Sequence, residues 1–315
     1  MKIAHIGNTA GVASIISDEQ RKNNHAVEVF VFNKLLYQQF GGTFIDYQFI
    51  RYMNNRNRSV NFSFFLERNR LFKKLQNYEI WHYHYPYGSL KRNISKHLQG
   101  HILLNHYHGD DLRNKSDNDF CVVATPDLLK FAPNGMWVPN PINVGDIRNF
   151  VRSGSNEHQI PWIAHYPYYK NYTGYPDYYS LSLSNLEKNG KCKVVTILRQ
   201  DYHTALTTMA GCDIVVGKIL PSVGWFGKFE LEAMTLGKPV ITYISDELFE
   251  MYRPPVCRTN KDNFEKDLET LLEDVHEQKR LSIEGRSYIE NTHSVKNVCQ
   301  LIEKCYKKCQ GSSRK

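Results

Sequence analysis

Residues 224–241, GWFGKFELEAMTLGKPVI, decide the fold that we predict for this chain. A glycine-bracketed turn at 224–227 leads into a run of helix formers at 228–236. Gly237 then stands where a helix C-cap favours a left-handed residue. A β-branched run at 240–244 follows, and it is typical of a buried parallel strand. The pattern predicts a turn, a helix, a tight reversal and a strand of an α/β sheet.

The start of this predicted helix is suited to bind an anion. Backbone N–H groups at a helix N-terminus point at whatever lies over the turn and favour negative charge there. Glu232 follows one helical turn later, where its carboxylate can accept hydrogen bonds from the two hydroxyls of a ribose. The residues alone leave two interpretations open: a nucleotide site, or an ordinary amphipathic helix in which Glu232 is solvated.

The same stretch resembles the donor-site signature of retaining glycosyltransferases of family 4. That signature reads E-G-F-G, then L-E-A-M-A-x-G-x-P-V-I, and the matches are Phe226-Gly227, residues 231–234 and residues 237–241. Glu232 matches the second glutamate of the family's E-x7-E pair, which the resemblance assigns to the donor ribose. The first glutamate, which marks the donor sugar, falls on Gly224 and is absent. Glu230 is close by but lies in the wrong register to replace it.

Composition describes a two-domain globular protein. The 315 residues allow two domains of about 150 residues each. No apolar run approaches the roughly 20 residues of a membrane span, and the N-terminus lacks the apolar core of a signal peptide. The seven cysteines are odd in number and scattered, which favours reduced thiols in a cytoplasmic protein. The net charge of +8 permits anionic partners, but no nucleic-acid motif is present, so we expect no nucleic-acid partner.

The N-terminal residues predict a strand at 2–6, a small-residue turn, a helix to about Lys22 and a second strand at 27–32. This β-turn-α-β opening is typical of a doubly wound sheet. The turn lacks the third glycine of G-x-G-x-x-G, and no acidic residue ends the second strand, which disfavours a nicotinamide oxidoreductase. By resemblance, Gly11 faces the cleft near the donor phosphates or the acceptor; the alternative is a tight turn with no ligand.

Two predicted strands each carry a His-x-His pair near the carboxyl end: His82 and His84, then His106 and His108. Alternation places the two histidines of a pair on one face, and ligands of parallel sheets bind beyond the carboxyl ends. A zinc site is conceivable, but no cysteine or carboxylate spacing supports it, so we predict no metal.

The segment HGDDLR at residues 108–113 is similar to the family's H-G-x-D-L-R. The resemblance implies that His108 lies beside the transferred sugar, where it can donate a hydrogen bond to a hydroxyl. It also implies that Asp111 and Arg113 orient the acceptor or hold the loop by pairing. We place His84 on the acceptor side with them.

The donor diphosphate is the second point of departure from the family. Family members usually follow the first strand of the second domain with an arginine and a lysine, which clamp the diphosphate. This chain offers Lys170 alone, with Thr173 where a lysine often stands, and Lys218 and Lys228 are available to compensate. The donor-binding residues that we predict are Gly11, Phe226, Gly227, Lys228 and Glu232, and the catalytic set is His108, Lys170 and Glu232.

Basic and aromatic residues alternate over residues 51–74, a composition that suits an anionic membrane interface. If that interpretation holds, the acceptor is lipid-linked and the protein is peripheral on the cytoplasmic face. The alternative is a helix with its rings packed inward and its bases in water.

These observations predict a GT-B architecture, two Rossmann-like domains facing across a cleft. The predicted domains are 1–145 on the acceptor side and 158–294 for the nucleotide-sugar, with a helix at 295–315 crossing back to the first domain. The implied activity is metal-independent transfer of a hexose-type sugar from a nucleotide diphosphate-sugar to a glycan or lipid-linked acceptor, with retention. No further cofactor is expected. The alternatives are a catalytically weakened sugar- or nucleotide-binding subunit and a nucleotide-sugar epimerase.

Overall fold

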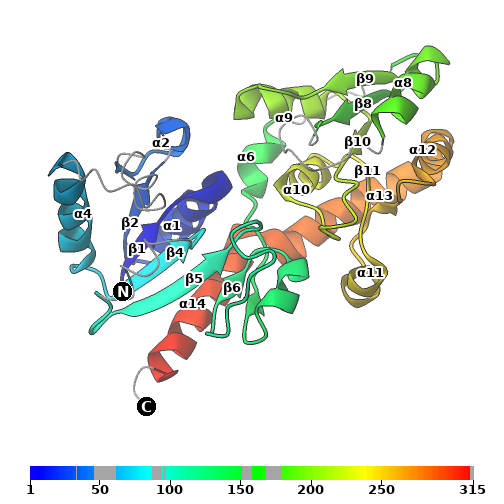
Figure 1. Ribbon diagram of the computed structural model, residues 1–315. Coiled ribbons are helices and arrows are strands. Elements are labelled where there is room, and N and C mark those ends of the chain that lie inside the picture. Colours follow the sequence, from blue (N-terminus) through cyan, green and yellow to red (C-terminus); the bar gives the residue numbers. More distant parts are fainter. Residues whose placement is uncertain are drawn as a thin grey trace. The chain divides into compact units, whose positions relative to one another are not determined.

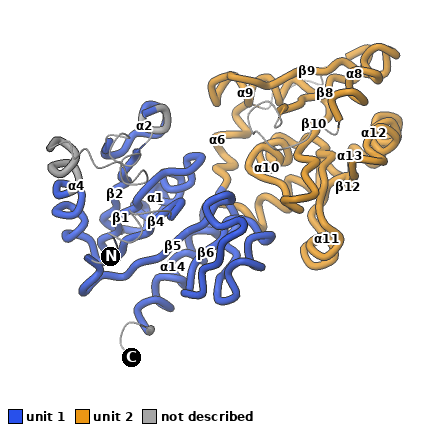
Figure 2. Tube along the Cα trace, viewed as in Figure 1, with its two compact units in different colours: residues 1–141, 295–315 blue, residues 142–294 orange. Residues whose placement is uncertain are grey.

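The computed structural model describes residues 1–32, 34–45, 62–86, 94, 97–150, 158–167 and 179–312. The chain forms two compact units (Figure 2): unit 1 is residues 1–141 with 295–315, and unit 2 is residues 142–294. Each unit has its own parallel sheet with helices beside it. The predicted α/β class is therefore confirmed.

The described sheet of unit 1 has seven parallel strands in the order β3-β2-β1-β4-β5-β6-β7. Figure 1 labels five of these strands, β2, β1, β4, β5 and β6. The interior strand β1 pairs with β2 on one side and β4 on the other, which is a doubly wound order. The strands are β1 Lys2–Ile6, β2 Ala26–Val31, β3 Thr43–Phe44, β4 Ile80–His84, β5 Ile102–Tyr107, β6 Val122–Val123 and β7 Met136–Trp137.

Side-chain alternation along β1 gives unit 1 two different faces. Ala4 and Ile6 pack with α4 (Phe62–Leu75) through a cluster that includes Leu71 and Leu75. Ile3 packs on the other face with α1 (Val12–Lys22) and α14 (Val295–Ser312). His5 shares this second face because it lies two residues after Ile3. The remaining described helices of the unit are η1 Thr9–Gly11, α2 Lys34–Phe40 and η2 Pro126–Phe131.

Helix α14 lies in unit 1 although it follows unit 2 in the chain. Val298, Ile302, Cys305 and Tyr306 are buried against the sheet, at the spacing that places residues on one helical face. The predicted apolar stripe of this helix thus covers the sheet face that carries His5.

The described sheet of unit 2 has five parallel strands in the order β12-β11-β10-β8-β9. The strands are β8 Trp162–His165, β9 Lys193–Thr196, β10 Ile214–Val216, β11 Val240–Thr242 and β12 Cys257–Arg258. The helices are α6 Val144–Arg148, α8 Ser180–Lys188, α9 Tyr202–Ala210, α10 Lys228–Thr235, α11 Asp246–Tyr252, α12 Phe264–Glu273 and α13 Val275–Tyr288, with a π-helical turn at Ile289–His293. The predicted turn, helix, reversal and strand at 224–244 are present as α10 and β11.

The boundary between the units follows Pro141, whereas we predict a first domain that runs to residue 145. The cause is local packing. Ile142 donates its backbone N–H to the carbonyl of His293 at 2.8 Å, and Ile142 and Ile147 are buried in the core of unit 2. Residues 142–150 therefore pack as part of the second unit.

Two sequence interpretations meet limits here. Helix α11 has no place in our prediction; none of the side chains of DELFEMY is fully buried, and Leu248, Phe249 and Tyr252 pack against the core of unit 2 while partly exposed. The basic and aromatic segment at 51–74 is described only from residue 62, so its membrane interpretation lies largely outside the described residues. Within the described parts, no helix is long and apolar enough to cross a bilayer.

Gly7 joins the end of β1 to the end of β4. Its φ is +89°, and a Cβ added there would lie 2.7 Å from the backbone carbonyl oxygen of His84. An alanine at this position therefore suffers both backbone strain and a collision with rigid main chain. Gly100 has a similar φ of +79°, but an added Cβ there would meet no other atom. An alanine at Gly100 therefore measures the backbone strain without the collision.

We expect Gly7→Ala to destabilise unit 1 by at least about 2 kcal/mol, and Gly100→Ala by about 1 kcal/mol. Urea unfolding followed by tryptophan fluorescence and circular dichroism measures both. Equal losses in the two variants would show that the close approach at Gly7 relaxes without cost.

Candidate functional site

Five histidines of unit 1 form one cluster on the sheet face beneath α1 and α14. They lie on three adjacent strands or just beyond them: His5 on β1, His82 and His84 on β4, His106 on β5 and His108 one residue past β5. The parallel register sets His5 opposite His82 and His84 opposite His106. Sequence alternation predicts that the histidines of each pair share a face, and the structure bears this out.

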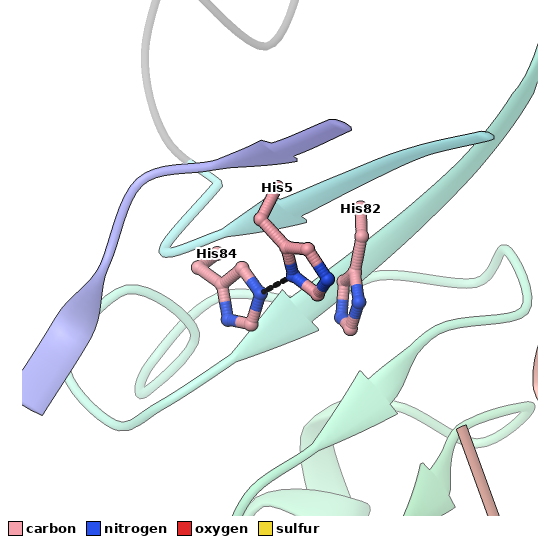
Figure 3. Close-up of side chains that lie close together, drawn as sticks. All are labelled: His5, His82 and His84. Atoms are coloured by element: carbon pink, nitrogen blue, oxygen red, sulfur yellow. Dashed lines mark hydrogen bonds between the residues drawn. The ribbon is translucent and has the colours of Figure 1, made fainter. Parts of the chain in front are cut away.

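The imidazole rings of the cluster contact one another, and Figure 3 shows three of them, His5, His82 and His84. The ring centroids of His82 and His84 are 4.2 Å apart, those of His5 and His82 are 4.8 Å apart, and those of His106 and His108 are 4.3 Å apart. His5 was not among the residues that we expected to be functional. Its signal in the sequence is weak, because one histidine in an apolar strand has no recognisable spacing.

Hydrogen bonds connect these rings to two helices. His5 Nε2 lies 2.8 Å from Gln20 Oε1 of α1, and His5 Nδ1 lies 2.9 Å from His84 Nε2. His84 Nδ1 lies 3.1 Å from His108 Nε2. A second series of hydrogen bonds starts at Tyr306 of α14, whose hydroxyl lies 2.8 Å from His82 Nδ1. It continues from His82 Nε2 to His106 Nδ1 at 3.2 Å.

Burial keeps all five histidines uncharged near neutral pH. Loss of hydration lowers the pKa of His5 to about 4 and that of His108 to about 3. The same cause, with smaller repulsion from neighbouring imidazoles, holds the pKa values of the other three well below the usual range; these are His82, His84 and His106. His84 is fully covered, so the structure places it behind His108 and not at a surface that an acceptor can reach.

The loop after β5 is held by charged side chains that we predict near the acceptor. The Asp111 carboxylate accepts the backbone N–H of His108 at 3.0 Å and that of Gly109 at 2.7 Å. Burial raises the pKa of Asp111 to about 6, although these two N–H groups oppose the shift. Of the two expected roles for Asp111, holding the loop is therefore the one that its contacts display.

Arg113 has the same kind of role in this loop. Its guanidinium pairs with Asp110 at 3.0 Å and with the buried Asp127 at 2.9 Å. Burial lowers the pKa of Arg113, but the two carboxylates outweigh it and the net shift is upward. Asp127 comes from the segment after β6, and sequence reasoning missed it because it lies fourteen positions away.

Gly11 is covered by a side chain within unit 1. Its φ is +76°, and a Cβ there would lie 2.5 Å from the Phe40 ring. The residue is buried. In this structure the missing side chain lets the Phe40 ring lie on the turn, and a contact between Gly11 and a ligand stays a prediction.

Two groups of histidines have the spacing of metal ligands: His5, His82 and His84, and then His84, His106 and His108. In each group one nitrogen per residue lies within 4.8 Å of the others. Most of these nitrogens already share hydrogen bonds with one another or with Gln20 and Tyr306. Metal binding would have to break those bonds, so the donor set does not favour a resident metal.

In unit 2, Glu232 projects from α10 in a nearly covered position. Its Oε1 accepts the Tyr202 hydroxyl at 3.0 Å and lies 3.6 Å from Lys228 Nζ. Burial raises the pKa of Glu232, and Lys228 and Tyr202 oppose that shift. No hydrogen bond to Oε2 is found within the described residues. Tyr202, from α9, is a contact that the sequence did not reveal.

Glu230 and the turn before α10 have a structural part. The two Glu230 oxygens accept the backbone N–H groups of Lys218 at 2.6 Å and Gly227 at 2.9 Å, and the second of these bonds caps the start of α10. Because the Gly227 amide is used in this way, it is not directed at a ligand. The Phe226 side chain is buried in the core, so its expected part in donor binding is left to its backbone. Lys170 lies outside the described residues.

Gly224, which stands where the resembled signature has its first glutamate, has a φ of +77°. Its N–H donates to Leu220 at 3.1 Å, and its carbonyl accepts from Ser245 at 3.1 Å. An L-residue rarely adopts this backbone conformation. The departure from the family is therefore built into the turn, and a glutamate placed there would be strained.

Comparisons with known proteins come from structure. No family model and no curated protein sequence matches the chain. A glycosyltransferase from Rickettsia africae is 12% identical with a TM-score of 0.65, covering 98% of both chains. Anabaena Alr3699/HepE in complex with UDP-glucose is 14% identical with a TM-score of 0.64, covering 98% of this chain and 100% of that one. The catalytic domain of starch synthase IV from Arabidopsis thaliana, bound to ADP and acarbose, is 12% identical with a TM-score of 0.60, covering 98% and 99%.

These neighbours are glycosyltransferases of the GT-B fold, and they match the chain along nearly its whole length. At 10–14% identity the likeness establishes the fold. The predicted GT-B fold is thereby confirmed.

The histidine cluster makes the stability of unit 1 depend on pH. The unfolded chain binds protons at these imidazoles near the ordinary pKa of 6.5, whereas the folded chain does not. Unfolding therefore takes up protons below that pH. The stabilisation is fully present above about pH 6.5 and is lost as the pH falls toward the folded values. Asp111, with its raised pKa, acts in the opposite sense, but it is one group against five.

Between pH 6.5 and 4.5 we expect the free energy of unfolding of unit 1 to fall as the pH is lowered. The expected slope is steeper than about 1.4 kcal/mol per pH unit, which is the most that one histidine contributes. Urea unfolding over this range measures the slope. The exposed His276→Gln variant controls for loss of a histidine from unit 2 and should retain the wild-type slope of unit 1. A slope of zero would show that the cluster is charged or hydrated in the folded state.

Proposed function

We propose that this protein is a retaining glycosyltransferase of family 4, which transfers a hexose-type sugar from a nucleotide diphosphate-sugar without an essential metal. The acceptor that we propose is a glycan or a lipid-linked sugar, reached in the cytoplasm or at the cytoplasmic face of a membrane. Two structures of Anabaena Alr3699/HepE contain UDP-glucose and UDP with glucose, and the structure of starch synthase IV contains ADP with acarbose; these ligands belong to those proteins. They support nucleotide-sugar chemistry for a chain of the same fold.

The single observation that carries this proposal is Glu232. It is a nearly buried carboxylate on the helix after β10, and the motif around it matches the donor signature. One oxygen is engaged by Tyr202 and Lys228, which orients the group, while Oε2 has no hydrogen bond among the described residues. A pair of ribose hydroxyls is a ligand that can donate to such an oxygen.

Charge development at the leaving diphosphate is the chemical problem that the site must solve. Cations placed there stabilise the transition state more than the ground state, and so accelerate transfer. We assign this task to Lys170 by resemblance. Lys228 already has partners within unit 2, because it pairs with Glu232 and its Nζ lies 5.4 Å from the centre of the Tyr202 ring. His108 is proposed to contact the transferred sugar.

One observation favours a second candidate, a nucleotide-sugar-binding subunit with little transferase activity. Gly224 occupies the position of the donor-sugar glutamate in a left-handed turn, so the usual contact to that sugar is missing. Such a protein binds the donor and transfers nothing.

A thermal-shift screen against UDP-, GDP- and ADP-sugars, with the free nucleotides as controls, tests the proposal. A ligand that binds only the folded protein at 100 times its Kd stabilises it by about 2.7 kcal/mol. A shift with one donor, followed by transfer to a glycan or polyprenyl-linked sugar, is the expected result. Binding without transfer favours the subunit, and conversion of the donor without an acceptor favours an epimerase. No shift with any nucleotide or sugar would overturn the proposal.

We expect Glu232→Gln to weaken nucleotide binding by roughly tenfold to a hundredfold, because hydrogen bonds to a charged group contribute about 1.5–3 kcal/mol. Isothermal titration calorimetry with the donor found in the screen measures the change. Glu273→Gln, at an exposed position of α12 in the same unit, is the matched control and should bind as wild type. An unchanged Kd in Glu232→Gln would remove this residue from the donor site.

A further inference from the structure

The hydrogen bonds around Gln20 have a direction, and that direction begins at an atom that can only accept. Gln20 Oε1 lies 2.8 Å from His5 Nε2, so this ring nitrogen must carry the hydrogen. A neutral imidazole has one N–H, which leaves His5 Nδ1 as an acceptor. Both residues are completely buried, so the ring has no water with which to exchange these roles.

A neutral imidazole has one donor and one acceptor nitrogen, and this fixes the roles of the nitrogens in the next two rings, His84 and His108. His5 Nδ1 accepts, so His84 Nε2, 2.9 Å away, donates to it (Figure 3). His84 Nδ1 then has to accept, and its partner at 3.1 Å is His108 Nε2. His108 therefore carries its hydrogen on Nε2, pointing inward, and its Nδ1 has only a lone pair.

The outer nitrogen of His108 differs from every other in this series. His108 is partly exposed, whereas Gln20, His5 and His84 are buried. Nδ1 of His108 makes no hydrogen bond to any residue in the described ranges, while its ring is held from behind at Nε2. Its backbone is also fixed, because the N–H of His108 donates to Asp111.

We propose that Gln20 is a positioning residue: through His5 and His84 it sets the tautomer of His108, so that Nδ1 meets a ligand as a hydrogen-bond acceptor. The ligand that suits it is one that donates a hydroxyl hydrogen. This inverts the sequence-based expectation, in which His108 donates to a hydroxyl. That the hydroxyl belongs to a sugar rests on the proposed function, whereas the tautomer itself does not.

We call the hydrogen-bonded series Gln20, His5, His84 and His108 the relay. The relay orients the His108 ring and does not conduct protons to a distant acceptor. Its inner end is the amide of Gln20, which neither gains nor loses a proton at accessible pH. A proton taken up by His108 has no group to receive it at the buried end. Reversal of a single ring would set two lone pairs or two hydrogens against each other at a buried contact, so the three rings share the direction that the Gln20 amide sets.

A second branch supplies a matched control. The Gln20 Nε2 group donates to the Tyr306 hydroxyl at 3.2 Å, which leaves that hydroxyl's own hydrogen for His82 Nδ1. His82 Nε2 then donates to His106 Nδ1, and His106 Nε2 is left as a buried N–H without a partner. This branch ends at His106 and does not reach His108 by a hydrogen bond.

The test is ¹⁵N NMR of the full chain with labelled histidine at neutral pH, because protonated and unprotonated ring nitrogens differ widely in chemical shift. His108→Gln identifies the His108 signals. We expect wild-type His108 to show a protonated Nε2 and an unprotonated Nδ1. The opposite pattern, with the hydrogen on Nδ1, overturns the proposal, and this measurement needs only the His108→Gln variant to fold and no variant of the buried residues Gln20, His5 and His84.

Two variants then separate the branches. Gln20→Met keeps the side-chain length without hydrogen bonds, and we expect both His108 nitrogens to move to intermediate shifts as the tautomers mix. Tyr306→Phe removes one hydroxyl from the same buried cluster, and we expect it to shift His82 and His106 but not His108. Wild-type His108 signals in folded Gln20→Met would show that Gln20 does not set the tautomer.

An activity measurement separates this inference from the proposed function. If the protein is a glycosyltransferase, we expect Gln20→Met to lower kcat partially, less than His108→Ala does, with nucleotide affinity unchanged. Failure of every transferase assay leaves the NMR result intact and refutes only the proposed function. Full kcat in Gln20→Met with a mixed His108 tautomer would show that Nδ1 does not accept from the reacting substrate.

Discussion

One uncharged amide, the side chain of Gln20, joins three elements of unit 1. Its oxygen pairs with His5 in β1 and its nitrogen pairs with Tyr306 in the last helix, while its own backbone belongs to α1. A buried amide of this kind is stable only when both ends are paired, since an unpaired buried polar group costs about 1–3 kcal/mol. The amide also sets which ring nitrogens of His5, His84 and His108 donate and which accept hydrogen bonds. The chemistry of the carboxyl edge of the sheet therefore depends on a contact buried beneath it.

In unit 2, two glutamates on one helix also differ in their hydrogen-bond partners. Glu230 is wholly buried and both of its oxygens bind backbone N–H groups, so it holds the loop after β10 against the start of α10. Glu232 lies two residues later and points to a different side, where Tyr202 and Lys228 engage one oxygen. Because the first glutamate fixes the helix start, the second is presented from a rigid support. Position on the helix, and not residue type, separates the structural role of Glu230 from the donor-binding role that we propose for Glu232.

Glycines mark places where the chain departs from ordinary backbone for a reason that the contacts identify. At Gly7 the reason is the approach of one strand end to the carbonyl of another, and at Gly11 it is the Phe40 ring. At Gly224 the turn itself is left-handed and tied by hydrogen bonds at both its N–H and its carbonyl. The missing family glutamate is thus a property of the turn geometry as much as of the side chain.

The sequence by itself determined the α/β class, the GT-B fold, the α10 motif and the shared face of each His-x-His pair. These follow from local periodicity, glycine positions and a long motif, all of which act over short separations in the chain. Only the tertiary structure decided that His84 lies covered behind His108, that Gly11 packs under Phe40, and that Asp111 and Arg113 hold a loop. It also joined Gln20, His5 and Tyr306, which lie 15 and 286 residues apart along the chain. The physical reason is that hydrogen-bond partners between separate elements depend on strand register and helix packing, and neither leaves a spacing that a sequence displays.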